Sequence, residues 1–188
     1  MRVFIAVLVL IFSFQSWTKA DDISDFEIEG ISIGDSLLDY FTKKEIINSK
    51  IINYKDNKYK FAYLKKANSI YEVLQIGYKT NDKNFKIELI NGILDFKNNV
   101  DECWKKQDKI SNEIDYFFPN QEKEDSGKIT EYPEDDPEGL VARYITYYFN
   151  SGEQIAVYCN DYSKKSGLND NLKVQIMSKK MSDYLTKK

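Results

Sequence analysis

The chain has 188 residues, of which 42% are hydrophobic and 30% charged, with no histidine and two cysteines. A chain of this length can bury a substantial core. The missing histidine excludes Ser-His-Asp and Cys-His catalysis and His-based zinc sites, and two cysteines cannot build a Cys₄ metal site. Since the sequence also lacks a phosphate-binding glycine loop, a Gly-x-Ser-x-Gly elbow and an EF-hand pattern, we expect neither metal nor cofactor.

The first 20 residues have the pattern of a secretory signal peptide. Arg2 gives a minimal charged region, Val3 to Phe14 form a short apolar core, and Thr18 and Ala20 are small residues near a cleavage site. The apolar run is shorter than the ~20 residues that span a bilayer, so we expect cleavage after Ala20 rather than a membrane anchor. The expected mature protein is a single domain, residues 21–188, that is periplasmic or secreted.

The charge balance argues against nucleic acid as a partner. Without Arg2 and Lys19, the chain keeps 25 of its 27 basic residues against 30 acidic ones, a net charge of −5. Nucleic-acid binding needs a basic footprint. The absence of an Asn-x-Ser/Thr sequon favours a bacterial over a eukaryotic exported protein.

The N-terminal half alternates short helices and strands. Residues 25–33 alternate apolar and acidic side chains, which predicts a strand. Two short helices are expected within 36–48, the second opened by a Thr42–Glu45 capping box, with a polar loop over 48–57. Three further strands are predicted at 58–65, 70–79 and 84–96. The polar residues 80–83 predict a hairpin, and Asn91-Gly92 predicts either a tight turn or a bulge.

The strongest helix signal covers Asn98 to Phe118. Asn98 or Asn99 can cap its start, and Pro119 ends it. Apolar residues recur at spacings of three and four, which places them on one stripe of a helix that must lie on another element. This stripe contains Val100, Cys103, Trp104, Ile110, Ile114 and Phe117.

The remaining chain predicts an acidic surface loop over 120–138 and then more strands. Residues 140–149 and 153–162 have strand character and are joined by Asn150-Ser151-Gly152, which predicts a three-residue hairpin. A last strand is expected at 171–178 and a short helix at 181–187. The predicted fold is therefore α+β: an antiparallel sheet packed on one face by the long helix at about 99–118.

The two cysteines are expected to pair, because an exported chain meets an oxidising environment. Ile155, Val157 and Cys159 share one face of their strand, and a helix that carries Cys103 could dock there. Two free buried thiols, or a bond between two chains, are the alternatives.

Three places are candidates for binding or catalysis. Asp161 lies beside Tyr158 and Tyr162, where a carboxylate could take part in glycoside hydrolysis, although a surface acid at a strand end is the simpler interpretation. Arg143, in one strand with Tyr147, could clamp a carboxylate of a ligand or form a structural ion pair.

The third candidate is an acidic run that could bind calcium through oxygen ligands. It lacks the ligand spacing of a known calcium loop, so a solvated acidic loop is the simpler interpretation. The run comprises Glu131, Glu134, Asp135, Asp136 and Glu138.

Three segments together resemble a set of small exported bacterial α+β proteins with no assigned function. The segments are DFEIEGISIGDSLLDYF, NNVDECWKK and VYCNDYS. The resemblance implies an export signal, paired cysteines and an α+β domain, but no activity, substrate or site residue. The short IGDSLLDYF segment also resembles the helix-and-sheet units of periplasmic inhibitor-like and assembly-factor domains.

Two functions remain open. The leading hypothesis is an exported non-enzymatic binding or accessory domain for an unknown protein or small-molecule ligand, since one sheet face is expected to be left for partners. The alternative is a carboxylate-dependent hydrolase that acts on glycans or cell-wall material. An aromatic patch on the free face would favour binding, whereas two acids that face each other across a deep cleft would favour hydrolysis.

Overall fold

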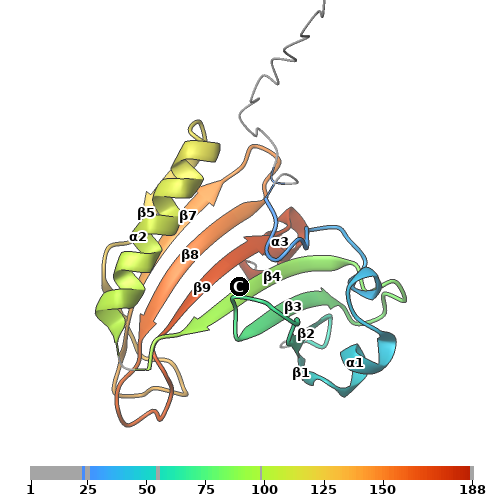
Figure 1. Ribbon diagram of the computed structural model, residues 1–188, viewed down its shortest axis with the longest axis horizontal. Coiled ribbons are helices and arrows are strands. Elements are labelled where there is room, and N and C mark those ends of the chain that lie inside the picture. Colours follow the sequence, from blue (N-terminus) through green and yellow to red (C-terminus); the bar gives the residue numbers. More distant parts are fainter. Residues whose placement is uncertain (1–22, 24–25, 54–55, 98, 187–188) are drawn as a thin grey trace, which may run out of the picture.

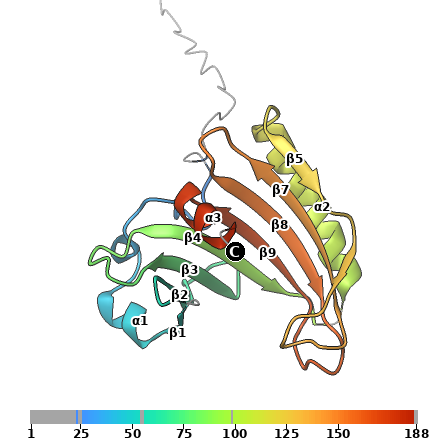
Figure 2. The same cartoon turned by 180° about the vertical axis from the view of Figure 1, so that it is seen from behind.

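The computed structural model describes residue 23 and residues 26–53, 56–97 and 99–186, and within them it contains one antiparallel nine-stranded sheet. The strand order is β1-β2-β3-β4-β9-β8-β7-β5, with β6 paired beside β5 on β7 (Figures 1 and 2). The strands are β1 (Lys50–Asn53), β2 (Tyr59–Leu64), β3 (Val73–Lys79), β4 (Ile87–Asp95), β5 (Glu122–Asp125), β6 (Ile129–Glu131), β7 (Leu140–Tyr148), β8 (Gln154–Asp161) and β9 (Asn171–Met177). The predicted signal peptide, residues 1–20, lies outside the described residues.

Four helical segments can be described in full, and they lie on the faces of this sheet or at its edge. They are η2 (Leu37–Asp39), α1 (Lys43–Asn48), α2 (Val100–Phe117) and α3 (Lys179–Thr186). Helix α2 packs on β8 and β9, and α3 contacts β4 from the opposite face (Figure 2). No helix in the described part of the chain is long and apolar enough to cross a membrane. The α+β prediction is thus confirmed in outline, although the molecule is mostly sheet.

The large apolar core lies between the sheet and α2. Strand alternation directs Ile155, Val157 and Cys159 of β8 toward the helix, and their neighbours Leu172 and Ile145 join the same cluster. Cys103 of α2 forms a disulfide with Cys159, with 6.1 Å between the Cα atoms. The predicted pairing is therefore confirmed, and it fastens the helix to the centre of the sheet.

Helix α2 itself begins and ends within one or two residues of its predicted limits. Asn99 is its N-cap residue but makes no side-chain capping hydrogen bond, and Asn98 lies outside the described residues. Phe117 was expected in the buried stripe, but its side chain is 53% exposed, and Phe118 is buried instead. The chain leaves helical geometry at Phe118, and this change of direction turns that ring toward Phe26 and Phe149.

The strand predicted over 25–33 is wrong. Ile28 and Ile31 bridge each other around a tight turn, because Glu29 and Gly30 both have positive φ, at 57° and 73°. Both isoleucines are buried against the core. Alternation of apolar and acidic residues is compatible with either arrangement, so the pattern alone could not detect the turn.

The two segments predicted as loops contain strands. The region 48–57 includes β1, which pairs with β2, and the region 120–138 includes β5 and β6, which both pair with β7. These are short edge strands with mostly exposed side chains. Polar composition of this kind is typical of edge strands as well as of loops.

The other local predictions are largely confirmed. The Thr42–Glu45 capping box opens α1, the β7–β8 hairpin turns with Gly152 at φ 89°, and β3 and β4 pair as a hairpin. Asn91 and Gly92 form neither a turn nor a bulge, since both pair in regular register with β3. Gly92 has a packing role instead, because the ring of Tyr71 lies 2.7 Å from where its Cβ would be.

Candidate functional site: the polar face of the sheet

Arg143, the first predicted site residue, binds two carboxylates of its own chain. Its Nη2 lies 2.6 Å from Asp125 of β5 and its Nη1 lies 2.7 Å from Asp108 of α2. The hydrogen bond from Arg143 lowers the pKa of the Asp125 carboxyl. Arg143 therefore ties β5 and α2 to β7, which corresponds to the structural ion pair that the sequence left open.

Tyr147 is also engaged inside the protein. Its side chain is only 1% exposed beneath α2. The hydroxyl donates to the Ser111 carbonyl and lies 2.9 Å from Asp115 Oδ1. Tyr147 thus supplies a polar contact at the interface between helix and sheet.

Asp161 lies at the end of β8, and alternation places it on the opposite face from Tyr158. Burial, and then the nearby Asp170, raise the pKa of its carboxyl. Asp170 accepts a hydrogen bond from the backbone N–H of Tyr162. The structure thus separates Asp161 from Tyr158 and brings it near a second acid.

The acidic run does not gather into a common site. Asp136 is buried and accepts hydrogen bonds from the Ser163 backbone N–H and hydroxyl. Glu131 accepts a hydrogen bond from the Tyr144 hydroxyl, and Glu138 pairs with Lys165. Within the described ranges no group of three acids, cysteines or histidines is arranged to hold a metal ion.

A different set of side chains comes together on the sheet face opposite α2. Strand registry aligns them in two neighbouring rows that cross the central strands, and we call this set the polar face. The first row is Tyr63, Gln75, Asn91 and Gln175 on β2, β3, β4 and β9. The second row is Lys173, Tyr158 and Tyr144 on β9, β8 and β7. Helix α3 covers the adjacent apolar cluster around Leu89 and Met177 but not these rows.

The first row is a chain of amide hydrogen bonds. Gln75 donates to the Tyr63 hydroxyl, and Asn91 Nδ2 donates to Gln75 Oε1 at 2.5 Å. The Asn91 side chain is 3% exposed, and its Oδ1 has no hydrogen-bond partner among the described residues. Gln107 Oε1 and Asn160 Oδ1 are likewise buried without a described partner, so this oxygen alone does not set the row apart.

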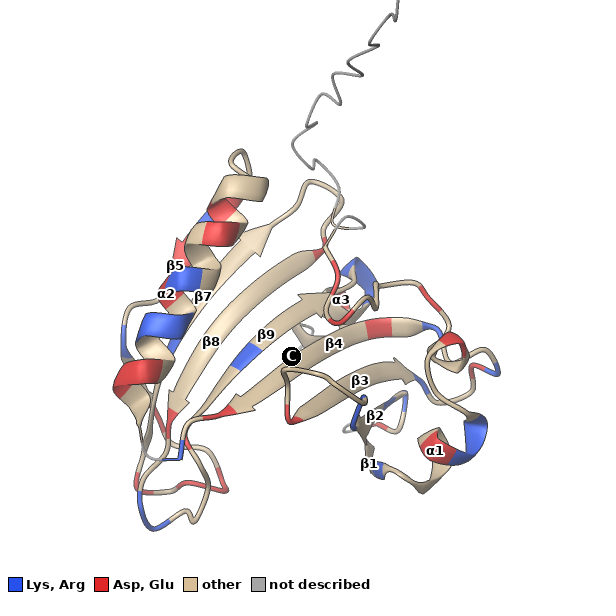
Figure 3. Cartoon of the chain, in the orientation of Figure 1, with Lys and Arg blue, Asp and Glu red and all other residues tan. Residues whose placement is uncertain are grey.

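Lys173 is the central feature of the second row. Its ammonium lies 5.5 Å from the centroid of the Tyr158 ring, and no described carboxylate oxygen lies within 4 Å of it. Burial lowers the pKa of this lysine, and the more distant Asp135 only partly opposes that effect. β9 contributes a single basic residue, which is visible as one isolated blue band in Figure 3.

Two tyrosines flank the lysine on one side. The rings of Tyr158 and Tyr144 lie 5.3 Å apart at an interplanar angle of 30°. Burial is the main cause that raises the pKa of both hydroxyls, and the Tyr144 hydroxyl already donates to Glu131. The polar face therefore offers one positive charge, aromatic surface and several hydroxyl and amide groups.

Sequence reasoning missed the polar face. The available signal was the strand NLKVQIM, in which Lys173 and Gln175 alternate with residues of the buried face. Polar residues in such positions normally face solvent, so the pattern gave no reason to single them out. Their grouping depends on the pairing of β4 with β9, which are distant in sequence.

Comparisons with protein-family models, with curated proteins and with solved structures gave no match.

Proposed function

We propose that the protein is an exported binding domain whose polar face takes a small hydroxylated carboxylate, such as a sugar acid. The observation that carries the proposal is the half-buried ammonium of Lys173, which has no carboxylate partner among the described residues. An ammonium removed from water is stabilised by a counter-ion, so a ligand carboxylate would complete the site. Export is supported by the disulfide and by the pattern of residues 1–20.

The neighbours of Lys173 suit the rest of such a ligand. Hydroxyl groups can exchange hydrogen bonds with the amide row and with the Tyr158 hydroxyl, while the carbon skeleton can lie on the Tyr158 ring. Binding sites combine apolar surface with a few convergent polar groups in this way. A protein partner would be expected to use a larger and more continuous surface.

Titration calorimetry with glucuronate and gluconate tests the proposal. Both should bind, and glucose, which has no carboxylate, should bind at least tenfold more weakly. Lys173→Met should weaken the binding of both acids roughly 10- to 100-fold, because a charge-assisted hydrogen bond contributes about 1.5–3 kcal/mol. Lys109→Met, on the exposed side of α2, is the matched control and should bind as the wild type does. Equal binding by wild type and Lys173→Met, or none by any acid, would overturn the proposal.

A carboxylate-dependent hydrolase is the second candidate, favoured by the interaction of Asp161 with Asp170. The pocket beside them is lined by Asp95, Tyr162 and Asn171, not by either of these acids. Glycan turnover that Asp161→Asn stops, while Lys173→Met leaves it intact, would favour this alternative over binding.

A further inference from the structure

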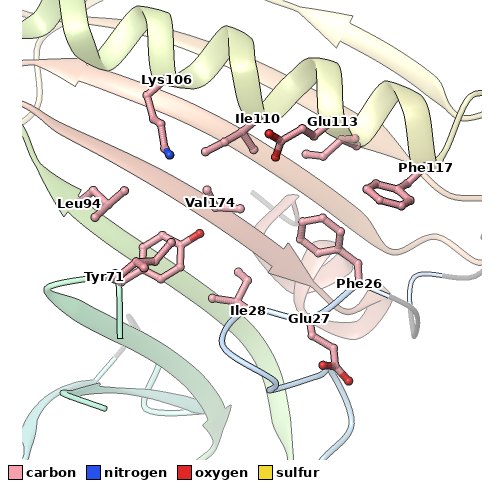
Figure 4. A pocket seen from close by; sticks show the side chains of 12 residues that line it. Phe26, Glu27, Ile28, Tyr71, Leu94, Lys106, Ile110, Glu113, Phe117 and Val174 are labelled. Carbon is pink, nitrogen blue, oxygen red and sulfur yellow. The ribbon is translucent and has the colours of Figure 1, made fainter. Parts of the chain in front are cut away.

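A second cavity lies on the α2 side of the sheet and is separate from the polar face. It has a volume of about 210 Å³ and is bounded by α2, by the segment that contains Phe26 and Ile28, and by Tyr71 (Figure 4). Ile110 of α2 and Val174 of β9 form further apolar walls. Phe117 lies at one end of the cavity, where its ring is 53% exposed.

Two hydrogen-bond donors enter this largely apolar cavity from different elements. Figure 4 shows the Lys106 ammonium and the Tyr71 hydroxyl directed toward the same end, near Val174 and Leu94. In the described part of the chain no carboxylate oxygen lies within 4 Å of Lys106, and no hydrogen bond involves the Tyr71 hydroxyl. Both groups are therefore available to a ligand.

Two acids, Glu113 and Glu27, also line the cavity. The Glu113 carboxylate projects from α2 into the cavity beside Ile110 (Figure 4), without an ion pair to the Lys106 ammonium. The carboxylate of Glu27 points out of the cavity (Figure 4). The cavity thus has two hydrogen-bond donors at one end, one carboxylate on the α2 wall, and apolar side chains over the remaining walls.

We infer that this cavity binds an amphipathic monocarboxylate, with the carboxylate at Lys106 and Tyr71 and a short acyl chain between Ile110, Phe26 and Phe117. The volume sets the length of the chain. Since one water-sized group occupies about 30 Å³, the cavity holds roughly seven such groups, equivalent to an acid of six to eight carbons.

Calorimetry with butyrate, hexanoate, octanoate and decanoate tests the inference. Affinity should rise about fourfold with each added methylene up to about eight carbons and then level off, because further carbons lie outside the apolar walls. Octanol and octylamine have the same chain without the carboxylate and should bind at least fivefold more weakly. Equal affinity for octanoate and octanol, or no binding of octanoate, would overturn the inference.

Variants locate the site. Lys106→Met should weaken the binding of octanoate at least fivefold. Phe117→Ala changes a half-exposed ring and should weaken octanoate binding without affecting folding. Lys109→Met and Lys173→Met should bind octanoate as the wild type does. Because Lys173→Met acts only on the polar face, failure of one site is distinguishable from failure of the other. Octanoate binding that survives both Lys106→Met and Phe117→Ala would contradict the assignment.

Discussion

The two faces of the sheet differ in the elements that pack on them and in the interactions that stabilise them. The α2 face carries the large apolar cluster, the disulfide and the buried hydrogen bonds of the helix. On the opposite face, Met181 of α3 packs in a small cluster with Leu89 and Met177, and no helix of the described ranges covers the polar face. The difference indicates that stability is concentrated on the α2 face, so the opposite face can hold an unpaired lysine and an amide row.

Removal of the disulfide should have the largest effect on this arrangement. The bond joins residues 56 positions apart, and loop-closure entropy for that length gives about 4 kcal/mol as an upper value. The double variant Cys103→Ala/Cys159→Ala should lose roughly 3–4 kcal/mol of unfolding free energy in urea titrations. Wild-type protein unfolded with a reductant should show a similar loss. A loss below about 1 kcal/mol would show that α2 needs no covalent attachment.

Ile114→Ala should cause the second-largest loss of unfolding free energy, because this side chain is 1% exposed between α2 and the sheet. We expect a loss of about 3 kcal/mol from the lost burial and the cavity left behind. Phe117→Ala is the matched control on the same helix, and its half-exposed ring predicts a loss below about 1 kcal/mol. Comparable losses in the two variants would mean that the apolar stripe ends at Phe117, as the sequence alone suggested.

Gln107→Leu should lower the free energy of unfolding by about 1–3 kcal/mol. The buried amide of Gln107 donates to the carbonyl oxygens of Val157 and Arg143, at 2.8 and 2.7 Å, and leucine leaves both without this donor. Asn112→Leu changes an exposed position of α2 and should stay within about 0.5 kcal/mol of wild type. If urea midpoints showed Gln107→Leu to be as stable as wild type, these hydrogen bonds would contribute nothing to docking.

The smallest expected effect is the acid response of the Arg143–Asp125 pair. Its lowered folded-state pKa means that Asp125 stabilises the fold above its unfolded pKa of about 3.9, and this contribution is lost as pH falls through the folded value. The pair is partly exposed, so the contribution should be below about 1 kcal/mol. Between pH 6 and pH 2, the free energy of unfolding should fall less steeply for Asp125→Asn than for wild type. An unchanged slope would argue against the pair.

The sequence predicts the parts of this molecule that local patterns determine. The helical period from Val100 to Ile114 predicts α2, and the shared face of Val157 and Cys159 indicates where it docks. The capping box at Thr42 and the hairpin at Gly152 are likewise local signals. Each depends on contacts within a few residues or on a single covalent constraint.

The parts that sequence reasoning missed depend on long-range pairing. Asn91 is the cross-strand partner of Gln175, and Lys173 is that of Tyr158, only because β9 lies between β4 and β8. No local pattern specifies that order. The cavity beside Lys106 likewise requires Tyr71 and Phe26 to approach one helix from separate segments.

Thermal unfolding of wild type and Lys173→Met at pH 7, with and without glucuronate, tests the central claim most directly. A folded-state pKa lowered by burial means that charged Lys173 destabilises the fold at pH 7, and this cost fades as pH rises through the lowered pKa toward the unfolded value of about 10.4. Tyr158 and Asp135 are the ionisable groups that act on it. The account predicts that Lys173→Met melts higher than wild type without ligand and gains nothing from glucuronate, whereas wild type is stabilised by it. A variant that melts lower, and that glucuronate stabilises as much as wild type, would contradict the account.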